Sequence, residues 1–360
     1  MKRCYSLAAG LVLLCAVSPA GAADLVSPIT KAHAPLSGAA VACRPLPEPV
    51  ISLNSQPYYT DGAFSVIDPE KLAREQAAAK PLNQLLNLVQ QAANDHRRGK
   101  PGAAACALAA LDSWARAGAL LGAFTLQGSY QRKWTLGGAA LAYLSIRDAP
   151  NLPPETIARV NAWIGKVGRA VRPYYDKRAI ANQNNHDYWA GLTVAAAGLV
   201  ADDRAMVEWG VSRLRQAMTV VTAEGGLPRE LARKRMALHY HLFSLPPLAA
   251  LARIAEANGM ALNASEQAAL DRLARFTFEA TQDPARIAML AGEPQDDPFL
   301  KGRPALVQGA GLELWLLTKP ANQGVSRPAS EPALDAALKA FRPYRMSWLG
   351  GDIQALWAAR

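Results

Sequence analysis

The feature that most restricts the fold is a helical pattern that starts at residue 68 and continues almost to the end of the chain. Asp68 is a favourable helix cap, and Pro69 suits the first helical position. Apolar residues then recur at helical spacing, namely Leu82, Leu85, Leu86 and Val89. Because strand signals are scarce, we expect an all-α fold in which residues 69–360 form a single domain.

Further helices are expected at residues 103–121, 128–146, 154–171, 186–200, 203–222, 229–243, 246–258 and 264–280. Short turns with Gly, Pro or Asn separate them, which indicates helical hairpins. No sequence repeat of the tetratricopeptide or ankyrin kind is evident. Such hairpins can form a bundle, a solenoid or a closed α/α toroid, and a toroid would hold a cleft at one end, where helix starts and loops gather.

The first 22 residues are typical of a secretory signal peptide. Lys2 and Arg3 precede an apolar run at residues 7–17, and Ala20-Gly21-Ala22 supplies small residues for cleavage. We therefore expect export to the periplasm. Later segments lack an uninterrupted apolar run of membrane-spanning length, so membrane insertion is not expected.

Residues 23–68 are rich in Pro, Ser and Gly, which predicts an extended N-terminal arm. Tyr58 and Tyr59 in this arm either form a flap over a binding site or serve as packing residues. Cys43 and Cys106 remain after removal of the signal peptide, and an exported pair most simply forms a disulfide. Two unpaired buried thiols are the alternative.

The chain carries a formal charge of +10. An excess of this size in an exported protein favours a polyanionic partner, which could be nucleic acid, anionic lipid or acidic polysaccharide. The basic residues are scattered rather than clustered in a run that would grip nucleic acid. We therefore do not expect nucleic-acid binding.

The stretch Asn182–Trp189 concentrates groups capable of chemistry, with three asparagines, His186, Asp187 and two aromatic residues. Asn184 or Asn185 is expected to start the following helix. A helix start offers free N–H donors and a partial positive charge, which suits an anionic ligand. A lone histidine there is more often structural, so its setting among amides and aromatics decides for a functional role.

A second stretch, Arg229–His241, supplies partners for it. Arg233 and Tyr240 are seven residues apart, so on one continuous helix they would share a face about 10 Å apart along the axis. His239 and His241 would then point elsewhere. An exposed basic helix with a packed tyrosine is the alternative.

Three chemistries are compatible with these residue types. A zinc site would use His186, His239 and His241, but histidines two apart diverge on a helix. A hydrolase would need a carboxylate pair, for which Asp187 and Glu230 are available. The third chemistry is β-elimination on a uronic acid, which needs neither metal nor cofactor.

In that reaction, Asn185 and Arg233 would neutralise the sugar carboxylate and so stabilise the carbanion at C5. Tyr240 or His186 would remove the C5 proton, and Tyr240 would return a proton to the departing C4 oxygen.

Four segments together resemble the family 5 polysaccharide lyases, the periplasmic alginate lyases. They are Asn184–Trp189, Arg132-Lys133-Trp134, Ser113–Leu120 and the Leu-Pro, Glu-Leu, Tyr-His and Leu-Pro-Pro-Leu motifs within Leu227–Leu248. The resemblance covers residues 100–260. It implies an incomplete α/α toroid with an arm and flap, and cleavage of polymannuronate-type chains to products with an unsaturated end.

The resemblance also implies site residues. Asn185 and Arg233 correspond to carboxylate neutralisers, and His186 and Tyr240 to acid/base residues. Trp189, Arg132, Lys133 and Trp134 would line the sugar cleft, and the Cys43–Cys106 pair matches the family's disulfide. We expect a monomer that binds an anionic polysaccharide.

One departure bears on substrate choice. Family members carry Lys-Tyr in the flap where this chain has Tyr58-Tyr59, so one charge contact with the polymer is lost. Glucuronan and hyaluronan share the C5 hydrogen and the C4 leaving group and are further candidate substrates. His239, beside Tyr240, is another residue where substrate choice could differ. A non-catalytic periplasmic protein that binds acidic polysaccharide is the alternative function.

Overall fold

The structure is a computed structural model that describes residues 24–318 and 331–358. The predicted signal peptide, residues 1–22, lies outside the described residues. The arm is described from residue 24 and, as expected, contains no helix or strand. None of the helices in the described part of the chain is both long and apolar enough to cross a membrane.

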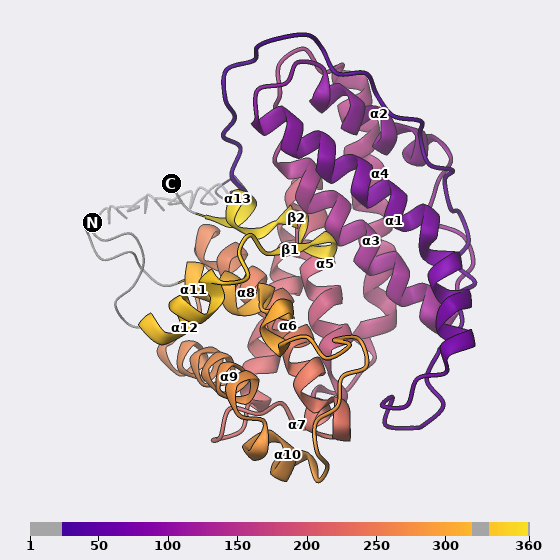
Figure 1. Ribbon diagram of the computed structural model, residues 1–360. Helices are drawn as coiled ribbons and strands as arrows, with labels where there is room; N and C mark the ends of the chain where they lie inside the picture. The colour runs from indigo at the N-terminus through magenta and orange to yellow at the C-terminus, as the bar shows by residue number, and fades with distance from the viewer. Residues whose placement is uncertain (1–23, 319–330, 359–360) are drawn as a thin grey trace, which may run out of the picture.

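Helices dominate the structure (Figure 1). Up to residue 220 the chain forms α1 (Pro69–Arg97), α2 (Ala103–Arg116), α3 (Leu126–Leu144), α4 (Pro154–Asp176), α5 (Asn185–Ala201) and α6 (Arg204–Val220). The C-terminal half contains α7 (Pro228–Leu231), α8 (Ala237–Ala257), α9 (Ala264–Gln282), α10 (Ala285–Ala291), α11 (Ala310–Leu317), α12 (Pro332–Lys339) and α13 (Ile353–Trp357). A small antiparallel pair, β1 (Arg345–Met346) and β2 (Gly351–Asp352), precedes α13.

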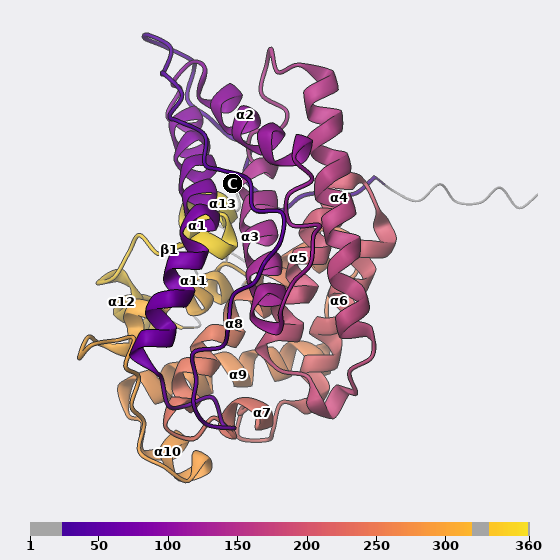
Figure 2. The ribbon, with the colours of Figure 1, turned by 90° about the vertical axis from the view of Figure 1, so that its right-hand side faces the viewer.

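The long helices form hairpins in two layers. The inner layer contains α1, α3, α5, α8 and α11, each in contact with the next, and the outer layer contains α2, α4, α6 and α9 (Figures 1 and 2). Helices α3 and α5 are buried along almost their whole length, whereas α4 and α9 bury one face. Helix α5 lies closely against α6. Position 210 requires glycine there, because a Cβ at Gly210 would be 2.4 Å from the Gly191 carbonyl oxygen.

The predicted start of the helical region is confirmed. Asp68 caps α1 through bonds from the backbone N–H groups of Glu70 and Lys71, and Pro69 occupies the first helical position. Outside residues 229–258, the other predicted helices are found with ends shifted by a few residues, as in α2, which stops at Arg116 rather than at residue 121.

The prediction of separate helices at 229–243 and 246–258 is wrong. The chain forms the short α7, a turn and then α8, which runs through Pro246 and Pro247. The break occurs at Lys234, whose φ of 56° is in the left-handed region. Helix α8 tolerates Pro247, which cannot donate to the Phe243 carbonyl, because the indole Nε1 of Trp189 donates to that oxygen instead, at 3.1 Å.

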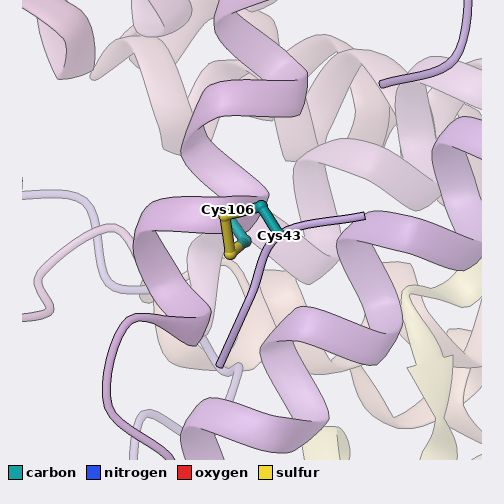
Figure 3. Close-up of a disulfide and its surroundings, with 2 residues drawn as sticks. All are labelled: Cys43 and Cys106. Atoms are coloured by element: carbon teal, nitrogen blue, oxygen red, sulfur yellow. A yellow bond between two sulfur atoms is a disulfide. The ribbon is translucent and has the colours of Figure 1, made fainter. Parts of the chain in front are cut away.

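The arm runs along the outside of the helices to the start of α1 (Figure 1). It crosses the start of α3 at Leu53, where Gly128 is required because a Cβ there would be 1.9 Å from the Leu53 carbonyl oxygen. Cys43 and Cys106 form the predicted disulfide, which joins the arm to α2 (Figure 3). The segment Tyr58–Ile67, which we call the flap, follows this attached part of the arm and is closed by a bridge between Tyr59 and Ile67.

Loss of the disulfide is expected to weaken the fold. The bond closes a loop with a sequence separation of 63 residues, which corresponds to about 4 kcal/mol in the chain-entropy model. The Cys43→Ser/Cys106→Ser variant should unfold at lower urea concentration than the oxidised protein. The reduced wild-type protein is the control and should match the variant, whereas an unchanged urea midpoint in both would contradict the expectation.

Candidate active site

The inner helices start around one cavity of about 770 Å³. Residues near the starts of α1, α3, α5, α8 and α11 line it, together with the flap and the segment around β1. The cleft expected at the helix starts of a toroid is therefore present. Helix starts carry partial positive charge, so this end of the fold favours an anionic ligand.

The start of α5 is fixed by a capping box. The Asn184 side chain accepts from the backbone N–H of His186 at 3.0 Å, and the Asp187 carboxylate accepts from the backbone N–H of Asn184 at 3.0 Å. The prediction that Asn184 or Asn185 starts this helix is confirmed, with Asn184 as the cap. As a result, Asn185 and His186 lie on the first turn of α5.

Asn185 belongs to a buried network behind the cavity wall. Its backbone N–H and its side-chain Nδ2 donate to Glu230 at 2.6 Å and 3.1 Å. The Arg233 Nε lies 3.5 Å from the other oxygen of Glu230. Burial raises the pKa of Glu230 above its ordinary value, against the lowering influence of Arg233 and Asn185. Glu230 therefore holds the amide and the guanidinium in fixed positions relative to each other.

His186 forms part of the cavity wall. Its ring stacks on Tyr130 with centroids 3.6 Å apart and planes 10° apart, and its Nδ1 lies 3.3 Å from the Nζ of Lys133. Burial holds the pKa of His186 well below its ordinary value, and nearby cations lower it further. The imidazole is therefore held in one orientation and in its neutral form.

Arg233 and Tyr240 meet in the cavity, although not for the predicted reason. Arg233 lies in the turn after α7 and Tyr240 on the first turn of α8, so the expectation of two turns on one helix was wrong. The guanidinium carbon is 4.9 Å from the Tyr240 ring centroid. Burial raises the pKa of Tyr240, while the hydrogen bond with Tyr59 and the charge of Arg233 lower it.

The flap covers this pair. The hydroxyl groups of Tyr59 and Tyr240 share a hydrogen bond of 2.8 Å, and Arg233 donates to the flap carbonyl of Ala63 at 3.4 Å. Within the flap, the Asp61 carboxylate accepts from the backbone N–H groups of Ser65 and Val66, both at 2.8 Å. Tyr58 and Tyr59 both line the cavity, as the flap hypothesis required.

The charges around the cavity are mainly positive. Arg178, Arg229, Arg233 and Arg345 line it, whereas Glu75 is the one carboxylate among the described lining residues. Glu75 accepts hydrogen bonds from the side chains of Gln127 and Gln131.

Trp134 and His239 line the cavity, as expected. Trp134 stacks on Trp348 with centroids 4.6 Å apart. The Nδ1 of His239 is 2.9 Å from the Asp297 carboxylate. The prediction that His239 points away from Tyr240 was therefore wrong, because both side chains border the same space.

Three residues expected to line the sugar cleft do not line the cavity, and these expectations need correction. Asn185, expected to contact the sugar carboxylate, is also fully buried and does not line the cavity. Arg132 donates to the carbonyl of Ala170 at 3.0 Å, on the side of α3 that faces α4. Trp189 is 1% exposed and packs behind Phe243. Lys133 is fully buried and contacts His186 from beneath.

The alternatives weighed from the sequence fit less well. Both ring nitrogens of His241 are engaged within the fold, at 2.9 Å from the Leu227 N–H and 2.7 Å from the Ala237 carbonyl oxygen. His241 is therefore not available to join the other two histidines, and the described residues contain no cluster of three His, Cys, Asp or Glu side chains that could hold a metal. Asp187 and Glu230 are both fully buried and engaged as described, which leaves neither free as a hydrolytic carboxylate.

Several cavity residues were missed from the sequence. One helix face of α3 presents Gln127, Tyr130 and Gln131 to the cavity, together with the predicted Trp134. Their spacing of three, four and seven residues is a signal that could have revealed them. Arg345 and Trp348 reach the cavity from the far end of the chain, and local sequence offers no signal for that.

Comparison with known proteins agrees with this geometry. The family model described as alginate lyase matches residues 52–287. A "Polysaccharide lyase" of Stenotrophomonas maltophilia is 38% identical over 324 residues, which cover 88% of this chain and 91% of the relative. An "Alginate lyase" of Azotobacter vinelandii is 34% identical over 288 residues, 77% of each chain.

Solved structures give the same picture. A histidine-to-alanine variant of alginate lyase A1-III complexed with a tetrasaccharide matches with a TM-score of 0.71 at 25% identity, covering 88% of this chain and 86% of that one. Alginate lyase A1-III from Sphingomonas species A1 matches with a TM-score of 0.70. The two layers of hairpins are thus the predicted α/α toroid. The chain belongs to the alginate lyase family of polysaccharide lyases.

Proposed function

We propose that this chain cleaves alginate, preferentially at mannuronate, by metal-independent β-elimination that leaves a 4,5-unsaturated uronate end. The observation that carries the proposal is the meeting of Arg233, His186 and Tyr240 at one cavity with mainly positive surroundings. Relatives and neighbouring structures named alginate lyase support alginate as the polymer.

The first task of the site is to make the C5 proton acidic. A guanidinium that binds the uronate carboxylate neutralises its charge and stabilises the carbanion that forms beside it. Arg233 suits this role because Glu230 and the flap carbonyl of Ala63 hold it in place. Asn185 is fully buried and its Nδ2 donates to Glu230, so its part in this proposal is to fix Glu230 and thereby Arg233.

The second task is proton transfer. Tyr240 removes the C5 proton as phenolate and, once protonated, donates to the departing C4 oxygen. Arg233, with its guanidinium carbon 4.9 Å from the ring centroid, favours the phenolate. His186 lines the same cavity and is the third of these polar side chains placed around the reacting sugar.

The stereochemistry of a single acid/base residue favours certain sugars. In D-mannuronate and D-glucuronate the C5 hydrogen and the C4 oxygen lie on the same face of the ring, whereas in L-guluronate they lie on opposite faces. One phenol can serve the first arrangement. Glucuronan and hyaluronan therefore remain candidate substrates besides polymannuronate, and the Tyr58-Tyr59 flap and His239 are the residues we expect to influence that choice.

We also propose that the protein works in the periplasm. The predicted signal peptide and the Cys43–Cys106 disulfide support this, because disulfides persist in oxidising compartments.

The competing function is a non-catalytic binder of acidic polysaccharide that uses the same cavity. The ultraviolet absorbance of unsaturated uronate separates the two. With polymannuronate and a chelator present, we expect the absorbance to rise with time. Binding of the polymer without any rise would support the binder, and activity that disappears with chelator would contradict metal independence.

Tyr240→Phe should lower turnover by roughly 10²–10⁴-fold, the usual contribution of a general acid/base. Affinity for polymannuronate should be largely kept, since the ring remains. Tyr344→Phe is the matched control, because Tyr344 also lines the cavity but its hydroxyl donates to the Leu306 carbonyl at 3.0 Å. If Tyr240→Phe retained turnover, Tyr240 would not be the acid/base residue.

Arg233→Ala should lower kcat/KM by roughly 10²–10³-fold, as expected for a preorganised charge partner of the transition state. Arg229→Ala removes the same charge from an exposed position of the same cavity and should affect mainly KM. Steady-state kinetics on folded variants, checked by thermal unfolding, would measure this. If the two substitutions had equal effects on kcat/KM and KM, Arg233 would contribute only general electrostatic attraction for the polymer.

Tyr59→Phe should move the acidic limb of the kcat/KM profile to higher pH. The Tyr59 hydrogen bond lowers the pKa of Tyr240, so its loss raises that pKa, and a phenolate base is then formed only at higher pH. Tyr58→Phe is the control, because Tyr58 raises the pKa of Tyr240 and its loss should not give an upward shift. A downward shift in Tyr59→Phe would contradict the assignment of Tyr240 as base.

A further inference from the structure

Lys133 is a buried cation that the proposed reaction does not use. Its side chain is fully buried on α3, and no ion pair joins it to a carboxylate among the described residues. The nearest acidic influence is Asp187, whose carboxylate already accepts from Asn184 and pairs with Arg178 at 3.3 Å. A lysine in such a position is costly to the fold and calls for a function.

The surroundings of Lys133 support the cation without binding it to an anion. Its Nζ lies 4.1 Å from the Tyr130 ring centroid and 4.7 Å from that of Trp134, distances at which aromatic faces attract a cation. Its backbone carbonyl accepts from the Thr193 hydroxyl at 2.7 Å, which anchors this turn of α3 to α5. The side chain is therefore directed to one place.

That place is His186. The Lys133 Nζ is 3.3 Å from Nδ1 of the imidazole, and this is the hydrogen-bond acceptor for the ammonium among the described residues. Burial lowers the pKa of Lys133, whereas the ring faces of Tyr130 and Trp134 favour its ammonium form, which has three donors and no acceptor. The Nδ1 must then carry the lone pair, and the proton of a neutral imidazole lies on Nε2. Stacking on Tyr130 fixes the plane of the ring.

We propose that Lys133 is a positioning residue that donates to Nδ1 of His186, keeps the imidazole proton on Nε2 and thereby makes His186 a hydrogen-bond donor to the uronate instead of the base. The inference rests on the proposed function and deepens it, because it leaves Tyr240 as the group that both removes and returns the proton. A neutral imidazole with a protonated Nε2 cannot accept the C5 proton through that nitrogen.

The charges around His186 agree with a neutral ring. Lys133 faces it from α3, Arg178 from the segment after α4, and Arg233 from the turn before α8. Asp187, on the same turn of α5, is already paired. All three cations oppose a positive imidazole, and burial acts in the same direction.

Nitrogen NMR of the full mature chain with ¹⁵N-labelled histidine tests the tautomer directly. The chain has five histidines, so the His186→Gln variant identifies the signals of His186. We expect a protonated Nε2 and an unprotonated Nδ1 at neutral pH in the wild-type protein. A protonated Nδ1 would overturn the proposal, whatever the variants do.

Lys133→Met keeps the length of the side chain and removes its donor. We expect the tautomer preference of His186 to weaken and its titration midpoint to move to higher pH, since a neighbouring cation is lost. Arg132→Met is the matched control, because it removes an adjacent buried cation that bonds to Ala170 and should leave both readouts unchanged. Equal shifts in both variants would overturn a specific role for Lys133.

The kinetic readout separates this inference from the proposed function. Lys133→Met should lower kcat more than it changes KM, because the donor to the reacting sugar loses its fixed tautomer. A wild-type protein with a protonated Nε2 but no lyase activity would reject the proposed function and keep the tautomer. Lyase activity together with a protonated Nδ1 in His186 would contradict the inference about Lys133 and support the proposed function.

Discussion

The site depends on the arrangement of the inner helices, which all begin at the same end of the toroid. Their partial positive ends and four arginines face one cavity, so a polyanion is attracted before any single contact forms. The buried carboxylate of Glu230 makes this concentration of positive charge compatible with folding. It accepts from the first turn of α5 and pairs with Arg233, and so fixes two segments that are 45 residues apart in the sequence.

Burial gives the same groups their chemical character. It raises the pKa of Tyr240, against the lowering charge of Arg233, and it lowers the pKa of His186, so that the imidazole is neutral. The flap adds to this by placing Tyr59 on the Tyr240 hydroxyl and a backbone carbonyl on Arg233. A guanidinium aimed at a carboxylate is worth more in such a covered site than in water, because water no longer screens the charges.

Features encoded locally could be predicted from the sequence. The caps at Asp68 and Asn184 were correct because a cap requires only a short side chain and the N–H groups that follow it. The break at Lys234 could not be predicted, since its backbone is left-handed without the Gly or Asn that usually signals this conformation. The motifs that contain Arg132, Lys133 and Trp189 also did not reveal that these side chains face away from the cavity. Trp348 joined the site only through packing on Trp134, which no local pattern reveals.

In the proposed reaction, one sugar carboxylate is neutralised beside Tyr240. A crystal structure of the Tyr240→Phe variant with a bound mannuronate oligomer tests it most directly. We expect the carboxylate of one sugar to lie against Arg233, with its C5 hydrogen directed at the Phe ring edge and its C4 oxygen on the same side. An oligomer whose carboxylates all lie on Arg178, Arg229 or Arg345, with no sugar carbon near residue 240, would contradict the account.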